Sequence, residues 1–176
     1  ILCESDKKSQ ISSYFSSILL TLNTKNGMIN RLMISYYNTV LELLQYLLGE
    51  IFMKEIITTK NAPAAVGPYS QAVKSGNLFF CSGQIALDPA SGNLVGNDIK
   101  TQTEQVMHNI SAVLAASNSD FGNVVKTTCF LADINDFAEF NTVYAKYFTG
   151  KPARSCVAVS ALPKGALVEV EVLAVV

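Results

Sequence analysis

Two stretches of the chain carry apolar residues at helical spacing. From residue 99 to 114, and again from 137 to 147, an apolar side chain returns every three or four positions. This spacing places those side chains on one face and predicts two amphipathic helices. Polar residues that can cap a helix stand at each start: Asp98, or the pair Thr101 and Glu104, for the first, and Asp136 with Glu139 for the second.

Runs rich in β-branched and aromatic residues surround these helices. They cover residues 54–58, 69–73, 78–82, 124–131, 154–159 and 167–176. The turn residues Ser75, Gly76 and Asn77 join the second and third runs into an expected hairpin. The order β-β-β-α-β-α-β-β from Met53 onward predicts an α+β domain, with two helices on one face of a single sheet.

The last predicted strand has no cleanly polar face. Its two sets of alternating positions are Val168, Val170, Val172 and Ala174 on one side, and Glu169, Glu171, Leu173 and Val175 on the other. Two helices cover only one side of a sheet, so the other side needs a different partner. We expect self-association into a closed homo-oligomer, with a site where subunits meet.

Residues 1–52 differ in composition from the rest, being rich in Ser, Asn, Leu, Ile and Tyr. Residues 35–51 form a candidate amphipathic helix, but no run reaches the roughly 18 uncharged residues of a membrane span. The acidic residues Glu4 and Asp6 disfavour a secretory signal. We interpret Met53 as the natural start and residues 1–52 as an N-terminal extension, non-native or partly helical. Native peptides from upstream of Met53 in mass spectrometry would contradict this interpretation.

The charge balance points to a small partner. Thirteen basic and 14 acidic side chains give a net charge of −1, which favours neither nucleic acid nor a membrane surface. With no CxxC pair and one histidine, the sequence predicts no zinc site. The scattered cysteines Cys3, Cys81, Cys129 and Cys156 indicate reduced thiols and therefore a reducing, cytoplasmic location.

The stretch Pro152-Ala153-Arg154-Ser155-Cys156-Val157 places a permanent cation among apolar residues. In an extended strand Arg154 and Cys156 point to one face, and Ser155 and Val157 to the other. The planar guanidinium of Arg154 can bind a carboxylate through two parallel hydrogen bonds. The alternative, a surface arginine opposite an acidic neighbour, is equally compatible with these six residues alone.

Several motifs occur together and in order between Met53 and Val176. They are Asn61-Ala62-Pro63, Gly67-Pro68-Tyr69-Ser70-Gln71-Ala72, Ser82-Gly83-Gln84-Ile85, Asp133-Ile134-Asn135-Asp136-Phe137 through Asn141, the Arg154 stretch, Leu162-Pro163-Lys164-Gly165 and Val168-Glu169-Val170-Glu171. In these motifs the segment resembles the Rid (YjgF-like) family of reactive-intermediate deaminases. The resemblance spans essentially a complete family domain and excludes residues 1–52.

The resemblance implies a chorismate-mutase-like fold, assembled as a homotrimer whose sheets form a central barrel and whose sites lie at subunit clefts. It also implies hydrolysis of 2-imino acids, such as 2-iminobutanoate and 2-iminopropanoate, to 2-keto acids and ammonia, with no metal or organic cofactor. The family's site positions fall on catalytic Glu169, Tyr69 and Ser82, and on substrate-binding Arg154, Cys156 and Asn141. The loop between Phe148 and Pro152 is shorter than in many members, which affects the rim of the expected cleft.

These residues suit the implied chemistry, and each also has a structural alternative. Glu169 can hold and polarise the attacking water, or it can be an exposed residue or an ion-pair partner of Lys164. The hydroxyl groups of Tyr69 and Ser82, and the amide of Asn141, can bond to the imine nitrogen or the water. Their alternatives are a core aromatic, a turn residue and an exposed helix position, respectively.

Cys156 and His108 are not expected to act chemically. No histidine stands where it would activate Cys156, so we expect this thiol to line the site, with its backbone N–H meeting the carboxylate. His108 is expected to be structural. Two other functions stay open: a trimeric regulatory protein that binds keto or imino acids, and a translation-inhibitor endoribonuclease.

Overall fold

The computed structural model describes residues 39–42 and 54–176. The chain divides into two units, Ile1–Gly49 and Glu50–Val176, and the fold below belongs to the second. Residues 39–42 are helical, within the helix predicted over 35–51; the rest of that prediction and the predicted start at Met53 lie outside the described residues. Within the part of the chain described, no helix is long and apolar enough to cross a membrane.

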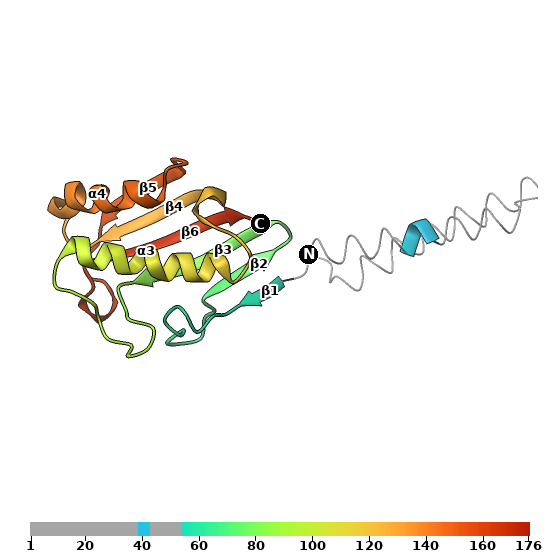
Figure 1. Ribbon diagram of the computed structural model, residues 1–176, viewed down its shortest axis with the longest axis horizontal. Coiled ribbons are helices and arrows are strands. Elements are labelled where there is room, and N and C mark those ends of the chain that lie inside the picture. Colours follow the sequence, from blue (N-terminus) through green and yellow to red (C-terminus); the bar gives the residue numbers. More distant parts are fainter. Residues whose placement is uncertain (1–38, 43–53) are drawn as a thin grey trace, which may run out of the picture. The chain divides into compact units, whose positions relative to one another are not determined.

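The elements of the second unit follow the predicted order (Figure 1). They are β1 (Lys54–Ile57), β2 (Ala72–Ser75), β3 (Leu78–Ile85), α3 (Ile99–Ala115), β4 (Val124–Leu131), α4 (Phe137–Tyr147), β5 (Ala153–Ala158) and β6 (Val168–Val175). Short 3-10 turns cover Phe121–Asn123, Ile134–Asp136 and Pro163–Gly165. The strands form one sheet in the order β1-β2-β3-β6-β4-β5. Strand β5 runs parallel to β4, and the other neighbours are antiparallel.

The hairpin of β2 and β3 forms as predicted, but β2 begins later. Gly76, with φ of 59°, and Asn77 make the turn between Ser75 and Leu78. Tyr69, predicted within the strand, lies instead in the connector before Ala72. Gly67 has a φ of 140°, which only glycine adopts readily, and this conformation interrupts the extended chain just before Tyr69.

The side chain of Gln71 holds this connector in place. Its Nε2 donates to the carbonyls of Thr59, Ala62 and Pro63 at 3.0, 3.1 and 2.7 Å, and its Oε1 accepts from Thr59 N at 2.7 Å. Gln71 is buried, and these bonds satisfy its amide. The irregular backbone that carries Tyr69 is therefore fixed by hydrogen bonds from a side chain and not by hydrogen bonds between paired strands.

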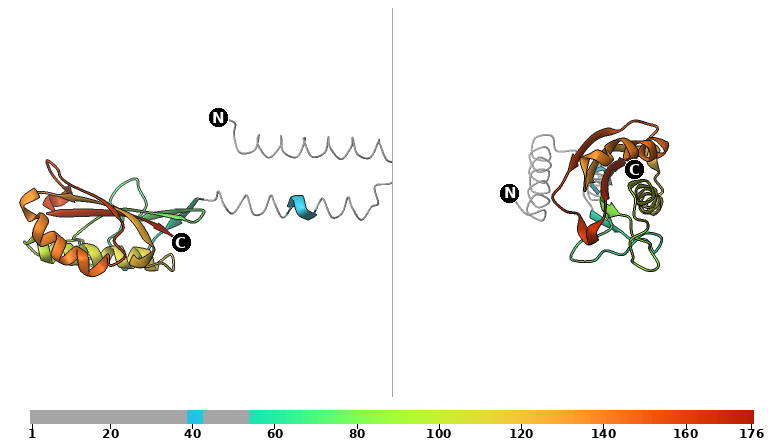
Figure 2. Two further views of the ribbon diagram at one scale, coloured as in Figure 1. Left: turned by 90° about the horizontal axis from the view of Figure 1, so that it is seen from above. Right: turned by 90° about the vertical axis from the view of Figure 1, so that its left-hand side faces the viewer.

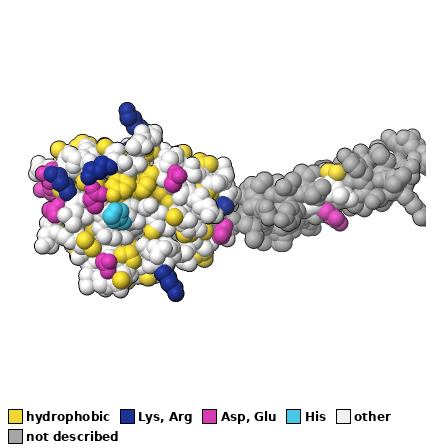
Figure 3. All heavy atoms as spheres, viewed as in Figure 1, with side chains coloured by type: hydrophobic (Ala, Val, Ile, Leu, Met, Phe, Trp, Pro, Cys, Tyr) yellow, Lys and Arg dark blue, Asp and Glu magenta, His cyan; other side chains and the backbone are white. Residues whose placement is uncertain are grey.

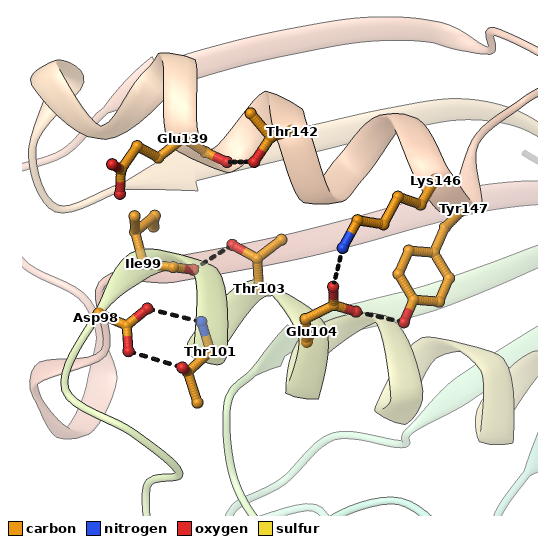
Figure 4. Close-up of polar contacts among 9 residues, drawn as sticks. All are labelled: Asp98, Ile99, Thr101, Thr103, Glu104, Glu139, Thr142, Lys146 and Tyr147. Carbon is orange, nitrogen blue, oxygen red and sulfur yellow. Dashed lines mark hydrogen bonds and ion pairs between the residues drawn. The ribbon is translucent and has the colours of Figure 1, made fainter.

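Helix α3 begins as predicted from Asp98. The Asp98 carboxylate accepts from Thr101 N at 2.9 Å and from Thr101 Oγ1 at 2.7 Å (Figure 4). The alternative capping box is wrong, because Glu104 turns away to helix α4. There its two oxygens accept from Lys146 Nζ at 2.7 Å and from the Tyr147 hydroxyl at 2.5 Å (Figure 4).

The predicted capping box of helix α4 is also wrong. Asp136 has helical backbone angles and makes no side-chain cap bond. The chain enters α4 through the 3-10 turn, and Asp133 caps that turn by accepting from Asn135 N at 2.9 Å. The helix is thus a continuation of a tighter turn, so its first N–H groups are not capped by an aspartate in the usual position.

Both helices lie on the same side of the sheet (Figure 2). Beneath them β6 buries Val168, Val170, Val172 and Ala174, while the alternating residues of β6 remain partly or fully exposed. Exposed apolar side chains occur along the opposite face: Ile56, Leu78, Phe80, Val157 and Val175. A single chain therefore leaves one face of its sheet without a covering layer, as the pattern of the last strand predicted.

Candidate active site

Arg154 lies on β5 and points toward helix α4. Its Nη1 donates to Asn141 Oδ1 at 2.7 Å. Its guanidinium carbon lies 4.7 Å from the centre of the Tyr144 ring and 5.4 Å from that of Phe137. Phe137, Asn141 and Tyr144 follow the i, i+4, i+7 spacing of one helix face, so a single face of α4 holds the arginine.

A hollow of about 400 Å³ opens beside Arg154. Its lining includes Asn141 and Tyr144 of α4 and the loop residues Phe148, Lys151 and Pro152. Among the residues that the structure describes, no carboxylate forms an ion pair with Arg154. Among residues 39–42 and 54–176, therefore, Arg154 has no acidic partner of the kind that the alternative required, and its one hydrogen bond leaves most of the guanidinium's five N–H donors available.

Cys156 shares the face of Arg154, as predicted, and is partly buried. It pairs with Cys129 of β4 in the parallel register. Burial is the main factor that raises the pKa of Cys156, although Arg154 lowers it in part, and burial raises the pKa of Cys129 to about 12. Both thiols are therefore protonated at neutral pH, which agrees with a lining role for Cys156 and not with a nucleophilic one.

Glu169 lies on β6 with its side chain against Gly83 of β3. A Cβ at position 83 would overlap Glu169 Oε1 and come within 2.8 Å of its Cδ. The absence of a side chain at Gly83 makes room for this carboxylate. Burial, and then the charge of Glu171, raise the pKa of Glu169. The predicted alternative partner, Lys164, donates instead to the carbonyl of Gly92 at 3.0 Å.

Tyr69 and Ser82 lie near the same irregularity of β3. The register between β3 and β6 shifts between Cys81 and Gln84, so Ser82 and Gly83 form a bulge. Ser82 Oγ donates to the carbonyl of Ser70 at 2.7 Å, and its lone pairs stay available. Tyr69 is half exposed, accepts from Val66 N at 3.3 Å, and shares a hollow of about 260 Å³ with Gly83.

The six predicted residues fall into two groups, and Tyr69 and Ser82 are linked to Glu169 through Gly83, which Glu169 contacts, which follows Ser82 in the chain and which shares a hollow with Tyr69. Arg154 stands in a cross-strand row with Thr127 and Val172, beneath the helices. Glu169 stands in a row with Phe130 and Val157, on the uncovered face. We call Arg154, Asn141 and Cys156 the arginine group, and Glu169, Tyr69 and Ser82 the carboxylate group. Within one chain Arg154 and Cys156 lie on the face under the helices, and Glu169 lies on the opposite face.

Sequence reasoning missed the residues that support these groups. Phe137 and Tyr144 belong to the apolar face predicted over residues 137–147, and their helical spacing with Asn141 is the signal that could reveal an arginine contact. Gly83 carried no signal beyond its place in a motif. His108 is exposed and touches the Tyr147 ring edge-on at 6.4 Å between ring centres, and it is the cyan side chain of Figure 3. It belongs to neither group.

The fold defines an α+β protein, in which Arg154 lies beside a hollow without an ion-pair partner among the described residues. Residues 59–176 match the family model described as Endoribonuclease L-PSP. The chain therefore belongs to this family, which is the Rid (YjgF) family that its motifs resemble.

The matches to three named relatives extend over nearly the whole length of each relative. The mouse protein named 2-iminobutanoate/2-iminopropanoate deaminase is 48% identical over 124 residues, which is 70% of this chain and 92% of the relative. The protein of Lactococcus lactis named putative regulator AldR is 54% identical over 121 residues, covering 68% of this chain and 96% of its own. The crystal structure of the Rid family protein YyfA from Yersinia pestis matches with a TM-score of 0.69 and 53% identity, covering 70% of this chain and 100% of that one.

Proposed function

We propose that the protein hydrolyses 2-imino acids, with 2-iminobutanoate and 2-iminopropanoate as the expected substrates. Water adds to the imine carbon, the C–N bond breaks, and the products are the 2-keto acid and ammonia. Relatives that carry this name at about half identity support the proposal. No metal or organic cofactor is needed for this reaction, because free imines already react with water.

Arg154 is the observation that carries the proposal. It is a cation without an internal carboxylate partner among the described residues, placed beside a hollow and held by two rings and an amide. A 2-imino acid offers a carboxylate one bond from the reacting C=N group. Binding that carboxylate in two parallel hydrogen bonds would orient the imine carbon for attack. The backbone N–H of Cys156, on an edge strand, would be a further donor.

Glu169 would hold the attacking water and accept its proton. A base works best when its pKa is close to the working pH, and burial and Glu171 raise the pKa of Glu169 in that direction. The Tyr69 and Ser82 hydroxyls would complete the network around the water and the departing nitrogen. The imine nitrogen leaves as ammonia after it takes up the two protons of the added water, one of them through protonated Glu169.

A complete site of this kind would need a second copy of the chain. Arg154 and Glu169 lie on opposite faces of one sheet, and the face that carries Glu169 is uncovered and partly apolar. We propose a homotrimer in the chorismate-mutase-like arrangement. In it, the uncovered faces would meet, and Arg154 of one copy would approach Glu169 of the next.

The test is ammonia release from freshly generated 2-iminobutanoate. Arg154→Ala should abolish most turnover, and Arg154→Lys should also fail, because removing one member of a desolvated charge pair costs on the order of 2 to 5 kcal/mol. If Arg154→Lys works at the parent rate, the carboxylate assignment is wrong. Size-exclusion chromatography with light scattering checks that both variants keep the parent assembly.

Two specific observations favour other functions. A relative at 54% identity is named a putative regulator, so a binding role without turnover is one candidate. Saturable binding of 2-ketobutyrate without ammonia release would favour it. The family model's description favours ribonuclease activity, although the net charge of −1 opposes strong RNA binding. RNA cleavage that survives Arg154→Ala would support that second candidate.

A further inference from the structure

Beneath Arg154 the otherwise apolar interior contains a pair of hydroxyl groups. Thr127 Oγ1 and the Tyr144 hydroxyl lie 2.8 Å apart and are hydrogen-bonded. Thr127 is fully buried and Tyr144 is 8% exposed. A buried hydroxyl is costly unless it is bonded, and replacing both partners by apolar groups of the same shape is close to neutral. Folding alone therefore gives little reason for this polar pair.

The pair connects the strand next to Arg154 with the ring that Arg154 faces. Thr127 of β4 is the direct cross-strand partner of Arg154 of β5. Tyr144 of α4 places its ring centre 4.7 Å from the guanidinium carbon. Burial raises the pKa of Tyr144, so its hydroxyl is neutral at ordinary pH and remains able to donate. The bond therefore fixes the tip of the Tyr144 ring relative to β4, the strand that pairs with the arginine's own strand.

Apolar contacts alone would not fix this ring. Tyr144 stacks on Phe148 at 4.3 Å between ring centres and tilts against Phe140 at 5.5 Å. Aromatic pairs prefer offset-stacked or edge-to-face arrangements but allow ring-centre distances over a range of more than about 2 Å, whereas a hydrogen bond holds its two atoms within a few tenths of an ångström. Arg154 itself donates one hydrogen bond within the described residues, to Asn141, which leaves the plane of its guanidinium to be set by the rings.

We infer that the Thr127–Tyr144 hydrogen bond positions the guanidinium of Arg154 for its carboxylate ligand, so that Thr127 and Tyr144 are positioning residues for this site. The inference rests on the proposed function of Arg154 and adds residues that act through it. Thr127 has no access to the ligand, since it is fully buried. The bond of its hydroxyl to Tyr144 is the route by which this side chain would act on Arg154.

A double-mutant cycle separates positioning from stability. Thr127→Val leaves the Tyr144 hydroxyl unpaired, and Tyr144→Phe leaves Thr127 Oγ1 with only the weak bond from Cys129 Sγ at 3.9 Å, so each should lower the Tm. The double variant leaves neither unpaired, and its Tm should return close to that of the parent. The KM for 2-iminobutanoate should rise on the order of tenfold in all three variants, with kcat within about twofold, because the positioning bond is absent from each.

Two outcomes would overturn the inference. One is a KM that stays at the parent value in the single variants. The other is a KM that recovers together with the Tm in the double variant, which would make the hydrogen bond purely structural. The matched control is Tyr147→Phe, which removes from the same helix a hydroxyl that bonds Glu104 of α3 instead of a group beside Arg154. Its KM should equal that of the parent.

Pyruvate binding by calorimetry distinguishes this inference from the proposed function. If Arg154→Ala loses pyruvate binding and Thr127→Val weakens it on the order of tenfold, both are supported. If Arg154→Ala loses binding and Thr127→Val keeps it, the inference is wrong and the proposed carboxylate clamp stands. If Arg154→Ala binds pyruvate as the parent does, the clamp is wrong and the inference falls with it.

Discussion

The side chain of Glu169 fits in its place because residue 83 is a glycine. The carboxylate occupies the space where a side chain at position 83 would begin. That space lies at a bulge of β3, where the ladder is already interrupted. The position of the proposed base is therefore set by a residue that has no functional group of its own.

Gly83→Ala should leave a folded protein with little activity. The new methyl group meets the flexible end of Glu169 and not the backbone, so the side chain moves aside and the fold adapts. We expect kcat/KM for 2-iminobutanoate to fall on the order of 100-fold, as for loss of a general base. The control is the fold itself: the Tm and the assembly measured by light scattering should stay close to those of the parent. Full activity of Gly83→Ala would show that the present place of Glu169 is not the working one.

Glu171→Gln should shift the acid limb of the rate profile to lower pH. The charge of Glu171 helps to raise the pKa of Glu169, so its removal lowers that pKa and keeps Glu169 ionised further into acid. Turnover is compared with the parent between pH 5 and 8 on the same substrate. Glu55→Gln, on β1 at the far edge of the sheet, changes the net charge equally and should leave the profile in place. An unmoved limb in Glu171→Gln would mean that another group controls it.

At the scale of elements, α3 and α4 are joined by one polar cluster and one exposed ion pair. Glu104 accepts from Lys146 and Tyr147, while Lys100 and Glu139 pair at 3.5 Å with both side chains more than half exposed (Figure 4 shows the first cluster). Hydrogen bonds from Lys146 and then from Tyr147 lower the pKa of Glu104. Burial, and then Glu104, raise the pKa of Tyr147 to about 12. The cluster joins α3 to the C-terminal turn of α4.

Glu104→Gln should reduce stability at neutral pH and have no effect in strong acid. A carboxyl whose pKa is lower in the folded state contributes stability above its unfolded pKa, and loses it as the pH falls through the folded pKa. We expect a loss of at most about 1 kcal/mol at pH 7 by urea denaturation, because the side chains remain partly solvated. Glu139→Gln, which breaks the exposed pair, should change nothing measurable. A Glu104→Gln deficit that persists at low pH would point to lost packing instead.

At the scale of the whole molecule, Arg154 and Glu169 face away from each other across one sheet. Because Arg154 shares a row with Thr127 and Glu169 shares a row with Phe130, no side-chain rearrangement brings them together. The proposed reaction therefore depends on assembly. The uncovered face, with exposed Phe80 and Val157, is the surface that such an assembly would bury.

Mixing two inactive variants should restore activity. Suppose that each site takes Arg154 from one copy and Glu169 from the next. Refolding Arg154→Ala together with Glu169→Gln in equal amounts should then make about a quarter of all sites intact by random association. Each variant refolded alone should stay inactive. Ammonia release is the readout, and light scattering reports the assembly. A mixture as inactive as its parts would contradict a shared site.

The order of elements, the cap at Asp98, the shared face of Arg154 and Cys156, and the uncovered face of the sheet followed from the sequence. Each depends on the local alternation of polar and apolar residues or on one capping residue, and these are visible within a few positions. The path of the chain around Tyr69 and the start of α4 did not follow. A buried Gln71 and a 3-10 turn decided them, and neither leaves a periodic signal.

Sequence alone determined that this chain folds as an α+β domain of the Rid family and that Arg154 stands beside Cys156, since periodicity and ordered motifs are properties of the chain itself. Only the tertiary structure decided that Arg154 rests on two rings of α4, that Gly83 makes room for Glu169, and that Arg154 and Glu169 lie on opposite faces. The reason is that strand order and register, with β4 inserted between β5 and β6, arise from long-range pairing that no local pattern encodes.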